Sequence, residues 1–519
     1  MPAVRQHISF VLNGSPCEVA GENALLTVSE YLRQRRGLIG VKTVCSEGDC
    51  GSCSVLVGRV DGDAVRYLPI DSCIQFVFQL DGAHLVTVEG LADKGSLSAV
   101  QQSMVGCHGS QCGFCTPGFV VAMTGLLEAS GGEGCGDEID DHQWREGLSG
   151  NLCRCTGYTQ ILEAGQRAAS GAWSRLAERY PDAPVIANAA ACKSQPFHIA
   201  GGAAAERTSN GLLTNGQRSN GQPAVAAPQV YSPIELRDAL QFRQEQPGCT
   251  VVAGATDLGV QRNKGRRAFT TLLDLSRLAE LRQMGETHAG ANGSRSAVLQ
   301  AGAMVTWTEL LAWCREHLTE FGNVLTLFGS PQIRHAGTLG GNIVNASPIA
   351  DSLPLLHVMN ARLRLQSTAG AREVDINDFY RGYKQLDLQP TELLTRVDLP
   401  LPSPQEKLRL YKVSRRKDMD ISTFTAAVRM RLEGDTIADA GLAFGAVGPT
   451  VLRLPETEAM LAGRVFSAET MRDAGDVATQ EITPLSDVRG SSDYRYQLAR
   501  NVLLRFHAEQ QPGAPAAAN

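Results

Sequence analysis

Alternating apolar and polar residues mark the first ninety positions as a region of short strands. Five segments alternate or carry β-branched residues, at 7–14, 14–21, 54–60, 64–70 and 84–90. One helix, expected at about 28–36, interrupts them. The pattern predicts a small α+β domain over residues 1–91.

The period of the apolar positions then changes to that of helices. Thr116 is expected as an N-cap and Pro117 as the first helical residue. One apolar face follows, made of Phe119, Val120, Met123, Leu126 and Leu127. Further helices are expected at 97–105, at 143–148 and after Thr156. Residues 92–178 are therefore predicted to form a four-helix domain, with a polar surface loop at 131–141.

The remainder of the chain divides by composition. Residues 179–228 are rich in Ala, Gly, Ser, Asn and Pro without a period, which predicts a flexible linker. Strands are expected at 250–254, 270–275, 297–304 and 361–366, and helices at 233–245 and 308–317. The α/β pattern indicates one domain at 229–402 and another at 403–508. Residues 509–519 are expected to be a disordered tail.

Composition and charge narrow the class of protein. The chain has 519 residues, 43% of them hydrophobic, and a net charge of −6, which gives no electrostatic support for a nucleic-acid partner. The first residues lack the apolar core of a signal peptide, and no apolar run approaches the ~18 residues of a membrane span. We therefore expect a cytoplasmic protein without a membrane partner, whose patterned cysteines bind metal.

The first group of patterned cysteines has the spacing C-x4-C-x2-C, followed by a lone cysteine. Its members are Cys45, Cys50, Cys53 and Cys73. This is the plant-type ferredoxin spacing of [2Fe–2S] sites. Gly48 and Gly51 would let the loop wrap tightly around a cluster. A structural zinc site is the alternative, but zinc sites usually use two short pairs.

The second group consists of two cysteine pairs, each just before an expected helix. Its members are Cys112, Cys115, Cys153 and Cys155. Helix N-termini carry partial positive charge, which suits a thiolate-ligated cluster, although the spacing alone also permits zinc. The six other cysteines show no pattern and are expected to be packing or surface thiols: Cys17, Cys107, Cys135, Cys192, Cys249 and Cys314.

The motifs GDCGSC, HGSQCGFCTPG and GNLCRCTGY, in this order, closely resemble those of the molybdenum hydroxylases, the family of xanthine dehydrogenases and aldehyde oxidases. The resemblance implies a β-grasp ferredoxin-like domain with one [2Fe–2S] cluster and a four-helix domain with a second. It also implies an FAD-binding α/β domain of the non-Rossmann type that this family has, and a C-terminal α+β domain. The segment between Cys115 and Cys153 is longer than the family's, with 131–141 as the insertion.

Two glycine-containing turns lie in the flavin region. The first lies in residues 251–258, which are predicted as a strand entering a turn, and the second begins at Thr338. Neither region contains the G-x-G-x-x-G motif of a Rossmann site. Such turns can bring backbone N–H groups to a pyrophosphate, although the residues alone leave a structural role open. The resemblance implies that FAD contacts Val251, Val252, Ala253, Gly254, Ala255, Thr256, Asp257, Leu258, Phe328, Thr338, Gly340, Gly341, Asn342, Asp351, Leu394 and Lys412.

Two further segments resemble the electron-acceptor side of the family. Tyr383 would border a nicotinamide, and the charged loop at 414–421 resembles one that lies over the flavin in xanthine dehydrogenases. Taken alone, Tyr383 would be an ordinary packed residue with a surface hydroxyl. The loop would be a solvated charge run.

The family's molybdenum–pterin domain has no counterpart in this chain. The resemblance therefore implies a separate large molybdenum subunit, in a heterodimer or an (αβ)2 heterotetramer, and no catalytic residue for hydroxylation here. It implies electron flow from molybdenum through both clusters and FAD to NAD, during oxidation of hypoxanthine and xanthine to urate. The alternatives are the corresponding subunit of an aldehyde oxidase-like or nicotinate-type hydroxylase, or a non-enzymatic iron–sulfur electron carrier.

Overall fold

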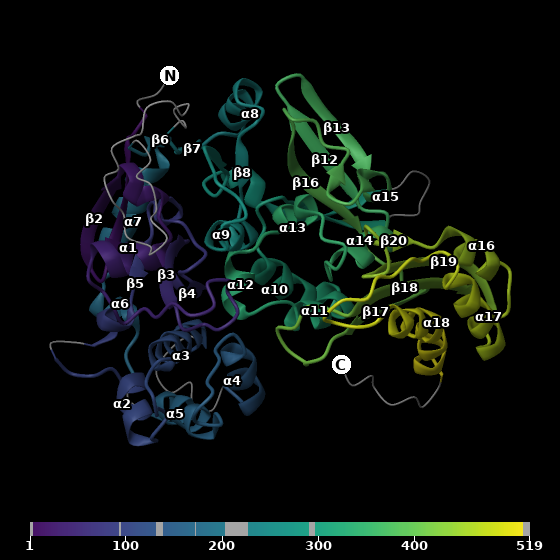
Figure 1. The fold of residues 1–519 in the computed structure, drawn as a ribbon, viewed down its shortest axis with the longest axis horizontal. Coiled ribbons are helices and arrows are strands. Elements are labelled where there is room, and N and C mark those ends of the chain that lie inside the picture. Colours follow the sequence, from purple (N-terminus) through teal and green to yellow (C-terminus); the bar gives the residue numbers. More distant parts are fainter. Residues whose placement is uncertain are drawn as a thin grey trace, which may run out of the picture. The chain divides into compact units, whose positions relative to one another are not determined.

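The computed structural model describes residues 4–92, 95–130, 139–171, 173–202, 227–289 and 296–511 (Figure 1). The chain divides into two compact units. Unit 1 comprises residues 1–278 and 330–336, and unit 2 comprises residues 279–329 and 337–519. Among the described residues, no helix has the length and apolar character needed to span a bilayer.

A five-stranded sheet forms the N-terminal part of unit 1. Its strands are β1 (His7–Leu12), β2 (Ser15–Ala20), β3 (Ser54–Asp61), β4 (Ala64–Asp71) and β5 (His84–Val86), in the order β2-β1-β5-β3-β4. β1 and β5 are parallel, and the other neighbours are antiparallel. Helix α1 (Val28–Arg35) begins at a capping box between Thr27 and Glu30. This is the β-grasp arrangement, and all five strands and the helix of the sequence prediction are present.

Four helices gather beside this sheet, with α3 packed on β3 and β4 (Figure 1). They are α2 (Ala99–Gly106), α3 (Thr116–Ser130), α4 (Asp141–Leu148) and α5 (Thr159–Ser170). Trp144 of α4 is fully buried and touches Gly165 of α5, where a Cβ would lie 2.8 Å from the indole ring. The predicted four-helix domain is confirmed, with α3 beginning at Thr116 itself. Residues 131–138 of the predicted surface loop and insertion lie outside the described residues.

The segment predicted as a flexible linker contains regular structure in unit 1. After the short helix α6 (Leu176–Arg179), which ends at the start of this segment, helix α7 (Asp182–Lys193) is followed by strand β6 (Phe197–Ala200). Helix α7 packs on β1, and β6 pairs with β7 (Gln229–Ser232). The linker prediction is therefore wrong for these elements, because Val185, Ala189 and Cys192 provide a buried face within an alanine-rich composition. Residues 203–226 lie outside the described part of the chain.

Strand β6 belongs to a four-stranded sheet that completes unit 1. The order is β6-β7-β9-β8, with β8 (Thr250–Val252) and β9 (Thr271–Asp274) parallel. Helices α8 (Leu236–Glu245), α9 (Thr256–Asn263) and α12 (Pro331–Ala336) also belong to this unit. Phe197, Val230, Val252 and Leu272 share one hydrophobic core with the ferredoxin-like sheet.

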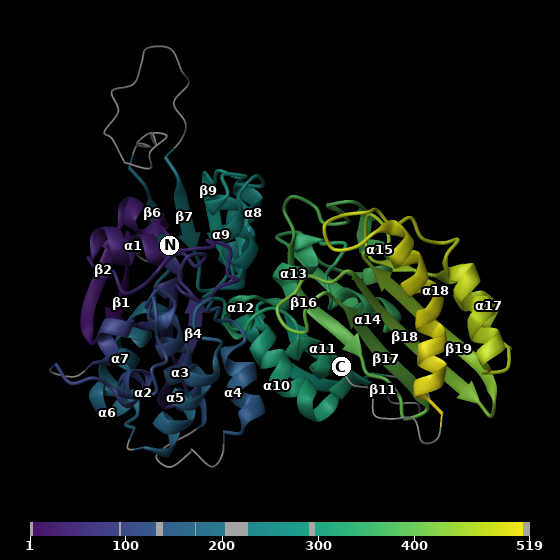
Figure 2. The same cartoon turned by 60° about the horizontal axis from the view of Figure 1, so that its bottom comes forward.

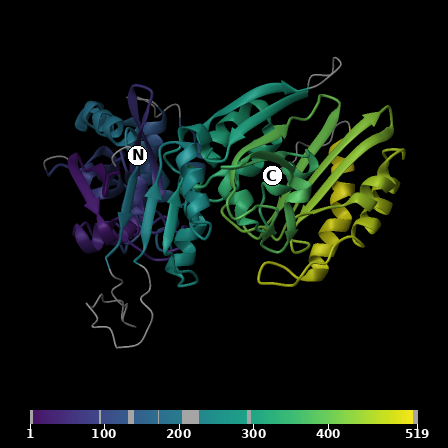
Figure 3. The same cartoon turned by 90° about the horizontal axis from the view of Figure 1, so that it is seen from above.

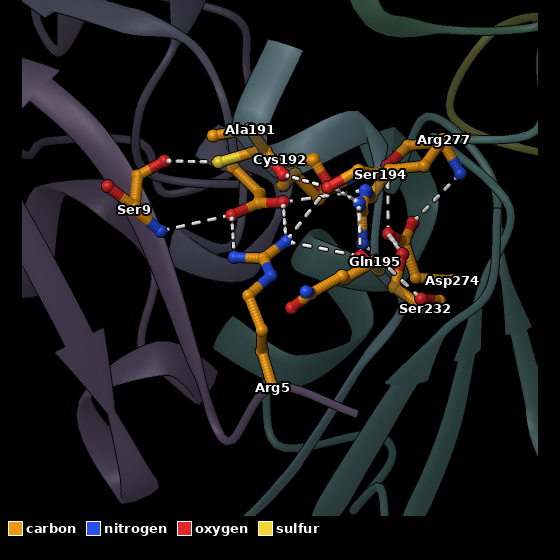
Figure 4. A network of polar contacts seen from close by, with 12 residues as sticks. Arg5, Ser9, Ala191, Cys192, Ser194, Gln195, Ser232, Asp274 and Arg277 are labelled. Carbon is orange, nitrogen blue, oxygen red and sulfur yellow. Dashed lines mark hydrogen bonds and ion pairs between the residues drawn. The ribbon is translucent and has the colours of Figure 1, made fainter. Parts of the chain in front are cut away.

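A buried charge network joins three segments of unit 1 (Figure 4). Asp81 is 1% exposed and accepts two hydrogen bonds from Arg5, at 3.0 and 2.6 Å, and one from Ser9 N–H at 3.0 Å. Arg277, which follows β9, lies 3.4 Å from the same carboxylate. Both guanidinium groups stack on Phe197, at 5.9 and 5.2 Å from the ring centroid. The network fixes the β6–β9 sheet to the N-terminal domain.

Unit 2 begins with a five-stranded sheet and a group of helices. The sheet order is β10-β11-β16-β12-β13, with β10 (Met284–Ala289), β11 (Ser296–Gly302), β12 (Arg362–Ser367), β13 (Gly370–Asp375) and β16 (Leu393–Pro400). The helices are α10 (Trp307–His317), α11 (Thr319–Thr326), α13 (Leu339–Asn345), α14 (Leu353–Val358) and α15 (Ile376–Phe379). A short hairpin, β14 (Tyr380–Gly382) and β15 (Gln385–Leu386), follows.

The C-terminal part of unit 2 is a four-stranded antiparallel sheet backed by helices. Strands β17 (Glu406–Val413), β18 (Phe424–Glu433), β19 (Thr436–Gly445) and β20 (Leu452–Arg453) pair in chain order. Figure 2 shows α17 (Ala468–Ala478) and α18 (Ser492–Glu509) side by side along this sheet, and Figure 3 shows them along one side of it. Helix α16 (Pro455–Leu461) packs on β19. Of the predicted tail, residues 512–519 lie outside the described residues.

Candidate cofactor sites

A tight loop presents the first cysteine group in unit 1. Gly48 and Gly51 adopt positive φ angles of 83° and 63°, a region that favours glycine. A Cβ on Gly51 would lie 2.4 Å from the carbonyl oxygen of Gly150, so this position has no room for a side chain. Cys73 follows β4 and is 2% exposed, whereas Cys45 and Cys50 are half-buried. The predicted glycine roles in the loop are thus visible in its geometry.

The thiols of this group contact one another in series: Cys50 contacts Cys45, Cys45 contacts Cys73, and Cys73 contacts Cys53. The thiols of Cys50 and Cys73 hydrogen-bond to Cys45 and hold the pKa of Cys45 well below its usual value. Cys73 likewise lowers the pKa of Cys53. The thiolate is the form of cysteine that binds metal, so these contacts favour that form at Cys45 and Cys53, whereas they raise the pKa of Cys50 and Cys73. Asp71 lies beside them, with Oδ1 3.5 Å from Cys53 Sγ, and burial raises the pKa of its carboxyl group.

The second cysteine group lies at the starts of α3 and α5. Cys112 Sγ and Cys155 Sγ are 3.6 Å apart and exposed, whereas Cys115 is half-buried and hydrogen-bonds to the buried Cys153. Helix α3 follows Cys115 directly, with the Phe119 N–H donating to the Cys115 carbonyl. Tyr158, at φ 72°, precedes α5; its hydroxyl accepts no capping hydrogen bond from this helix but accepts one from the Cys153 N–H at 2.9 Å. The two predicted pairs therefore meet.

Hydrogen bonds also select a thiolate in this second group. Burial raises the pKa of Cys153, but donors at Thr156 Oγ1 and at the Cys155 and Thr156 N–H groups outweigh burial and bring it to about 7. Thr156 Oγ1 lies 3.2 Å from Cys153 Sγ. Burial, together with Cys153, raises the pKa of Cys115 to about 12. Within this pair, Cys153 is therefore the thiol that ionises more readily to a thiolate.

The donor sets fit two iron–sulfur clusters. Each group divides into two adjacent thiol pairs, and a [2Fe–2S] cluster takes two cysteines for each iron. Within the described residues, no three His, Cys, Asp or Glu side chains converge as a single metal ion requires. Paired thiols on a glycine loop and at helix starts match a two-iron cluster better than a tetrahedral zinc site.

A backbone contact joins the two cysteine groups. The Leu152 N–H, adjacent to Cys153, donates to the Cys50 carbonyl at 3.1 Å. Asn151 Nδ2 donates to the Gly51 carbonyl at 3.1 Å, and Gln332 Nε2 of α12 donates to Asn151 Oδ1 at 2.9 Å. Both amide side chains are buried. The hydrogen bond from Leu152 therefore holds Cys153 of the second group close to Cys50 of the first, and Asn151 supports the same contact.

The first predicted FAD segment lies at the start of α9 in unit 1. Val251 and Val252 end β8, and residues 253–255 turn into the helix. Within the turn, Ala255 takes the left-handed conformation, with φ 61°. No side chain caps this helix start, so the first-turn N–H groups of Thr256, Asp257 and Leu258 suit a phosphate group.

The second predicted FAD segment starts α13 in unit 2. Thr338 is the N-cap, and its hydroxyl accepts the Gly341 N–H at 3.1 Å. Gly340 packs on Ala303, where a Cβ would lie 2.6 Å from the Ala303 Cβ. Asn342 Oδ1 accepts from Ser352 Oγ at 2.6 Å. The turn is tight, as predicted, and its glycines allow close backbone approach.

Two other predicted FAD residues of unit 2 form a buried ion pair. Lys412 Nζ lies 2.6 Å from Asp351 Oδ2 and donates to the Asp420 carbonyl at 2.9 Å and to Ser422 Oγ at 2.8 Å. The two charged side chains are 3% and 8% exposed. Asp351 lies before α14, whose N-cap is Ser352.

The remaining predicted residues of unit 2 differ in exposure. Phe328 is part-buried, with its ring centroid 4.9 Å from that of Trp307, and Leu394 is a core residue of β16, 5% exposed. Tyr383, between β14 and β15, is 61% exposed rather than packed. In the loop at 414–421, Asp420 accepts the Arg415 and Arg416 N–H groups, each at 3.0 Å. Their predicted FAD and nicotinamide contacts stay predictions.

Sequence reasoning missed the residues that hold these segments together. In unit 1, Gln75 Nε2 donates to the Gly254 carbonyl at 2.7 Å, and Gln79 Nε2 donates to the Ala253 carbonyl at 3.0 Å. Asn151 and Gln332 were missed as well. The sequence gives no sign of these contacts, because a single Asn or Gln that is buried in the fold belongs to no motif with a recognisable spacing.

Family models match four successive segments of the chain. They are "2Fe-2S iron-sulfur cluster binding domain" at residues 10–72, "[2Fe-2S] binding domain" at 87–166, "FAD binding domain in molybdopterin dehydrogenase" at 225–402 and "CO dehydrogenase flavoprotein C-terminal domain" at 409–510. Each cysteine group and each predicted FAD segment falls in or beside the corresponding match. The chain belongs to the molybdenum hydroxylase family. The matched segments are those of the family's iron–sulfur and FAD portion.

Relatives in this family include proteins of more than one specificity. Xanthine dehydrogenase 1 of Arabidopsis thaliana is 29% identical over 93% of this chain and 38% of its own length. Aldehyde oxidase 2 of Cavia porcellus is 29% identical over 96% of this chain and 39% of its own length. The chain thus spans about two fifths of these relatives.

Solved structures similar to the chain include a Cu,Mo-CO dehydrogenase, at 27% identity and a TM-score of 0.49 over 53% of this chain and 94% of the other. Quinoline 2-oxidoreductase from Pseudomonas putida 86 is similar at 27% identity and a TM-score of 0.48, over 55% and 96% of the two chains.

Proposed function

We propose that this chain is the electron-transfer subunit of a xanthine dehydrogenase. Electrons from a molybdenum site on a partner chain would enter the helical-domain cluster, pass to the ferredoxin-like cluster and FAD, and leave on NAD. The partner would oxidise hypoxanthine and xanthine to urate. Assembly would be a heterodimer or an (αβ)2 heterotetramer, in the cytoplasm.

The observation that carries this proposal is the unequal exposure of the two cysteine groups. Cys112 and Cys155 lie at the surface, and Phe114, Leu152 and Tyr158 near them are exposed apolar or aromatic side chains. Cys53 and Cys73 are buried, and Gln75, two residues after Cys73, holds the Gly254 carbonyl of the FAD segment. An exposed, apolar-rimmed group suits a docked electron donor, and the buried group adjoins the flavin segment.

In this chain the bound cofactors would supply the one-electron chemistry, and the protein would supply position and electrostatics. The eight patterned cysteines would hold the clusters as thiolates. Helix α9 would present N–H donors to the FAD pyrophosphate, and α13 would allow close backbone approach. Lys412 and Asp351 would bind a polar part of FAD. No side chain of this subunit needs to move a proton for the partner's hydroxylation.

Co-expression with a molybdenum subunit tests the proposal directly. The purified complex is expected to reduce NAD when xanthine is added, as followed by NADH absorbance. A complex that carries both clusters and FAD but oxidises only an aldehyde would overturn the substrate assignment. Turnover of xanthine with oxygen alone would overturn the NAD assignment.

An aldehyde oxidase-like subunit is the second candidate, because Aldehyde oxidase 2 of Cavia porcellus is as similar to this chain as Xanthine dehydrogenase 1 of Arabidopsis thaliana. A nicotinate-type hydroxylase subunit would be recognised by nicotinate turnover in the same assay. A free iron–sulfur carrier would show iron–sulfur absorbance bands without flavin bands. The absorbance spectrum of the purified chain separates this last alternative from the others.

A further inference from the structure

Helix α9 connects the predicted FAD segment to the first cysteine group within unit 1. Its first residues belong to the FAD segment, and its last residue, Asn263, reaches the cysteine loop. Asn263 Nδ2 donates to the Ser46 carbonyl at 3.0 Å and to the Cys73 carbonyl at 2.7 Å. One side chain thereby ties the segment that carries Cys45 to the segment that carries Cys73.

Lys264, the next residue, brings a positive charge to the same loop. Its Nζ donates to the Cys45 carbonyl at 3.2 Å and pairs with the Glu47 carboxylate at 2.9 Å. Both side chains are more than one third exposed, at 36% and 39%, so water and salt screen part of their charge. The ammonium group is nevertheless anchored directly on the backbone of a ligand residue.

The packing leaves α9 little freedom against this loop. A Cβ on Gly259 would lie 2.2 Å from the Ile74 carbonyl oxygen, so the helix backbone rests on the residue after Cys73. At the other end, Gln75 and Gln79 hold the Gly254 and Ala253 carbonyls before α9. The helix and residues 73–79 are interlocked along their lengths.

Acidic side chains lie in the cysteine loop itself. Glu47 and Asp49 lie in the loop. Arg262 of α9 pairs with Glu30 at 2.9 Å. Adding an electron to a thiolate-ligated cluster in such surroundings is unfavourable, and a fixed cation opposes that cost.

We propose that Asn263 and Lys264 position and tune the ferredoxin-like cluster, so that the flavin region itself sets the reduction potential of the cluster that supplies it. Asn263 fixes the spacing of the two ligand segments. Lys264 favours the reduced cluster by its charge. The step is the entry of one electron into the oxidised cluster, with no bond made or broken and no proton taken up.

A potentiometric titration of the full chain with both clusters loaded tests this proposal. Dithionite supplies the electrons, and low-temperature EPR follows each cluster signal, so neither the substrate nor the acceptor proposed above is involved. Lys264→Gln is expected to shift the reduction equilibrium of the ferredoxin-like cluster about tenfold toward the oxidised form, or about 59 mV more negative for one electron. Glu47→Gln is expected to shift it in the opposite direction.

Matched variants separate charge from structure. Lys264→Arg retains the cation and should retain the potential, and Lys193→Gln removes an exposed lysine at the end of α7 and should have no effect. The helical-domain cluster, whose signal Cys155→Ser identifies, is the internal reference. Asn263→Ala should broaden the ferredoxin-like signal at unchanged flavin content. Unchanged potentials in both Lys264→Gln and Glu47→Gln, at full iron content, would overturn the proposal.

Discussion

At the scale of single residues, buried charges and imidazoles are the most sensitive positions. Lys412 and Asp351 are almost fully removed from water, and each completes the other's hydrogen bonding together with Ser422. A buried ion pair contributes little net stability, but removal of one partner leaves an uncompensated charge. These two residues, which are predicted to contact FAD, therefore also carry part of the fold.

Lys412→Met is expected to lower the stability of unit 2 by about 3–5 kcal/mol, because Asp351 would remain buried without its cation. Thermal unfolding followed by flavin fluorescence measures the loss. The double variant Lys412→Met with Asp351→Asn should recover part of it. If the single variant melts at the temperature of the unmodified chain, the pair has no structural role.

His357 makes unit 2 sensitive to acid. Its Nδ1 donates to Asn377 Oδ1 at 2.8 Å, its Nε2 is buried and has no hydrogen-bond partner among the described residues, and burial lowers its pKa to about 4. An unfolded histidine has a pKa of about 6.5, so the unfolded chain binds more protons between these values. Stability is therefore fully present above pH 6.5 and falls as the pH is lowered toward 4, by roughly 3 kcal/mol at most from this residue.

Equilibrium unfolding of unit 2 from pH 8 to 4 measures this dependence. His357→Gln retains an amide for Asn377 but cannot titrate, so its stability should depend less on pH. His317→Gln on the exposed face of α10 is the control and should leave the slope unchanged. An equal slope in all three proteins would contradict the assignment.

At the scale of elements, helix α3 shows how packing fixes both cysteine groups. Gly118 lies one turn after Cys115, and a Cβ there would lie 2.2 Å from the Gly51 carbonyl oxygen. The sequence predicted the helix from its apolar face and its Thr-Pro start. It could not predict that the helix backbone touches the loop of the other group, because that contact spans more than sixty residues of chain.

Gly118→Ala is expected to destabilise unit 1 by about 1–3 kcal/mol through overpacking against a backbone oxygen, and to reduce iron content in both sites. Replacing glycine by alanine normally stabilises a helix by about 1 kcal/mol. A loss of stability in this variant would therefore by itself indicate overpacking. Gly106→Ala at the end of α2 is the matched control, since its Cβ would meet only the flexible Arg167 guanidinium. Iron analysis and thermal unfolding of both variants provide the comparison.

The element predictions were correct where local patterning was strong. Every predicted strand of residues 7–90 exists, and α8 and α10 lie within or beside their predicted ranges. The region of α7 and β6 was mistaken for a linker because alanine-rich composition hides a buried helix face. The hairpin β18–β19 was not singled out, since its alternating residues are apolar on both sides.

At the scale of the whole molecule, the chain forms two units, and the predicted FAD-binding domain is divided between them. Unit 1 contains both cysteine groups and the predicted FAD segment at α9. Unit 2 contains α13, Asp351 and Lys412. Unit 1 depends on the charge network around Asp81, which joins β1, α7 and the β6–β9 sheet.

Asp81→Asn is expected to lower the stability of unit 1 by about 3–5 kcal/mol, because Arg5 and Arg277 would remain buried without their carboxylate. Asp61→Asn breaks an exposed pair with Arg66, with side chains 71% and 57% exposed, and should cost less than about 1 kcal/mol. Thermal unfolding followed by iron–sulfur absorbance compares the two. Equal melting temperatures would show that the network is dispensable.

The sequence by itself determined the family, the eight candidate cysteine ligands and most elements of the N-terminal half. Ligand spacing within a short loop and apolar periodicity are local properties, and local geometry is written directly in consecutive residues. The tertiary structure alone decided which segments meet: Leu152 with Cys50, Asn263 with Cys73, and Gln75 with Gly254. These contacts depend on packing between residues far apart in the chain, for which neither spacing nor composition carries a signal.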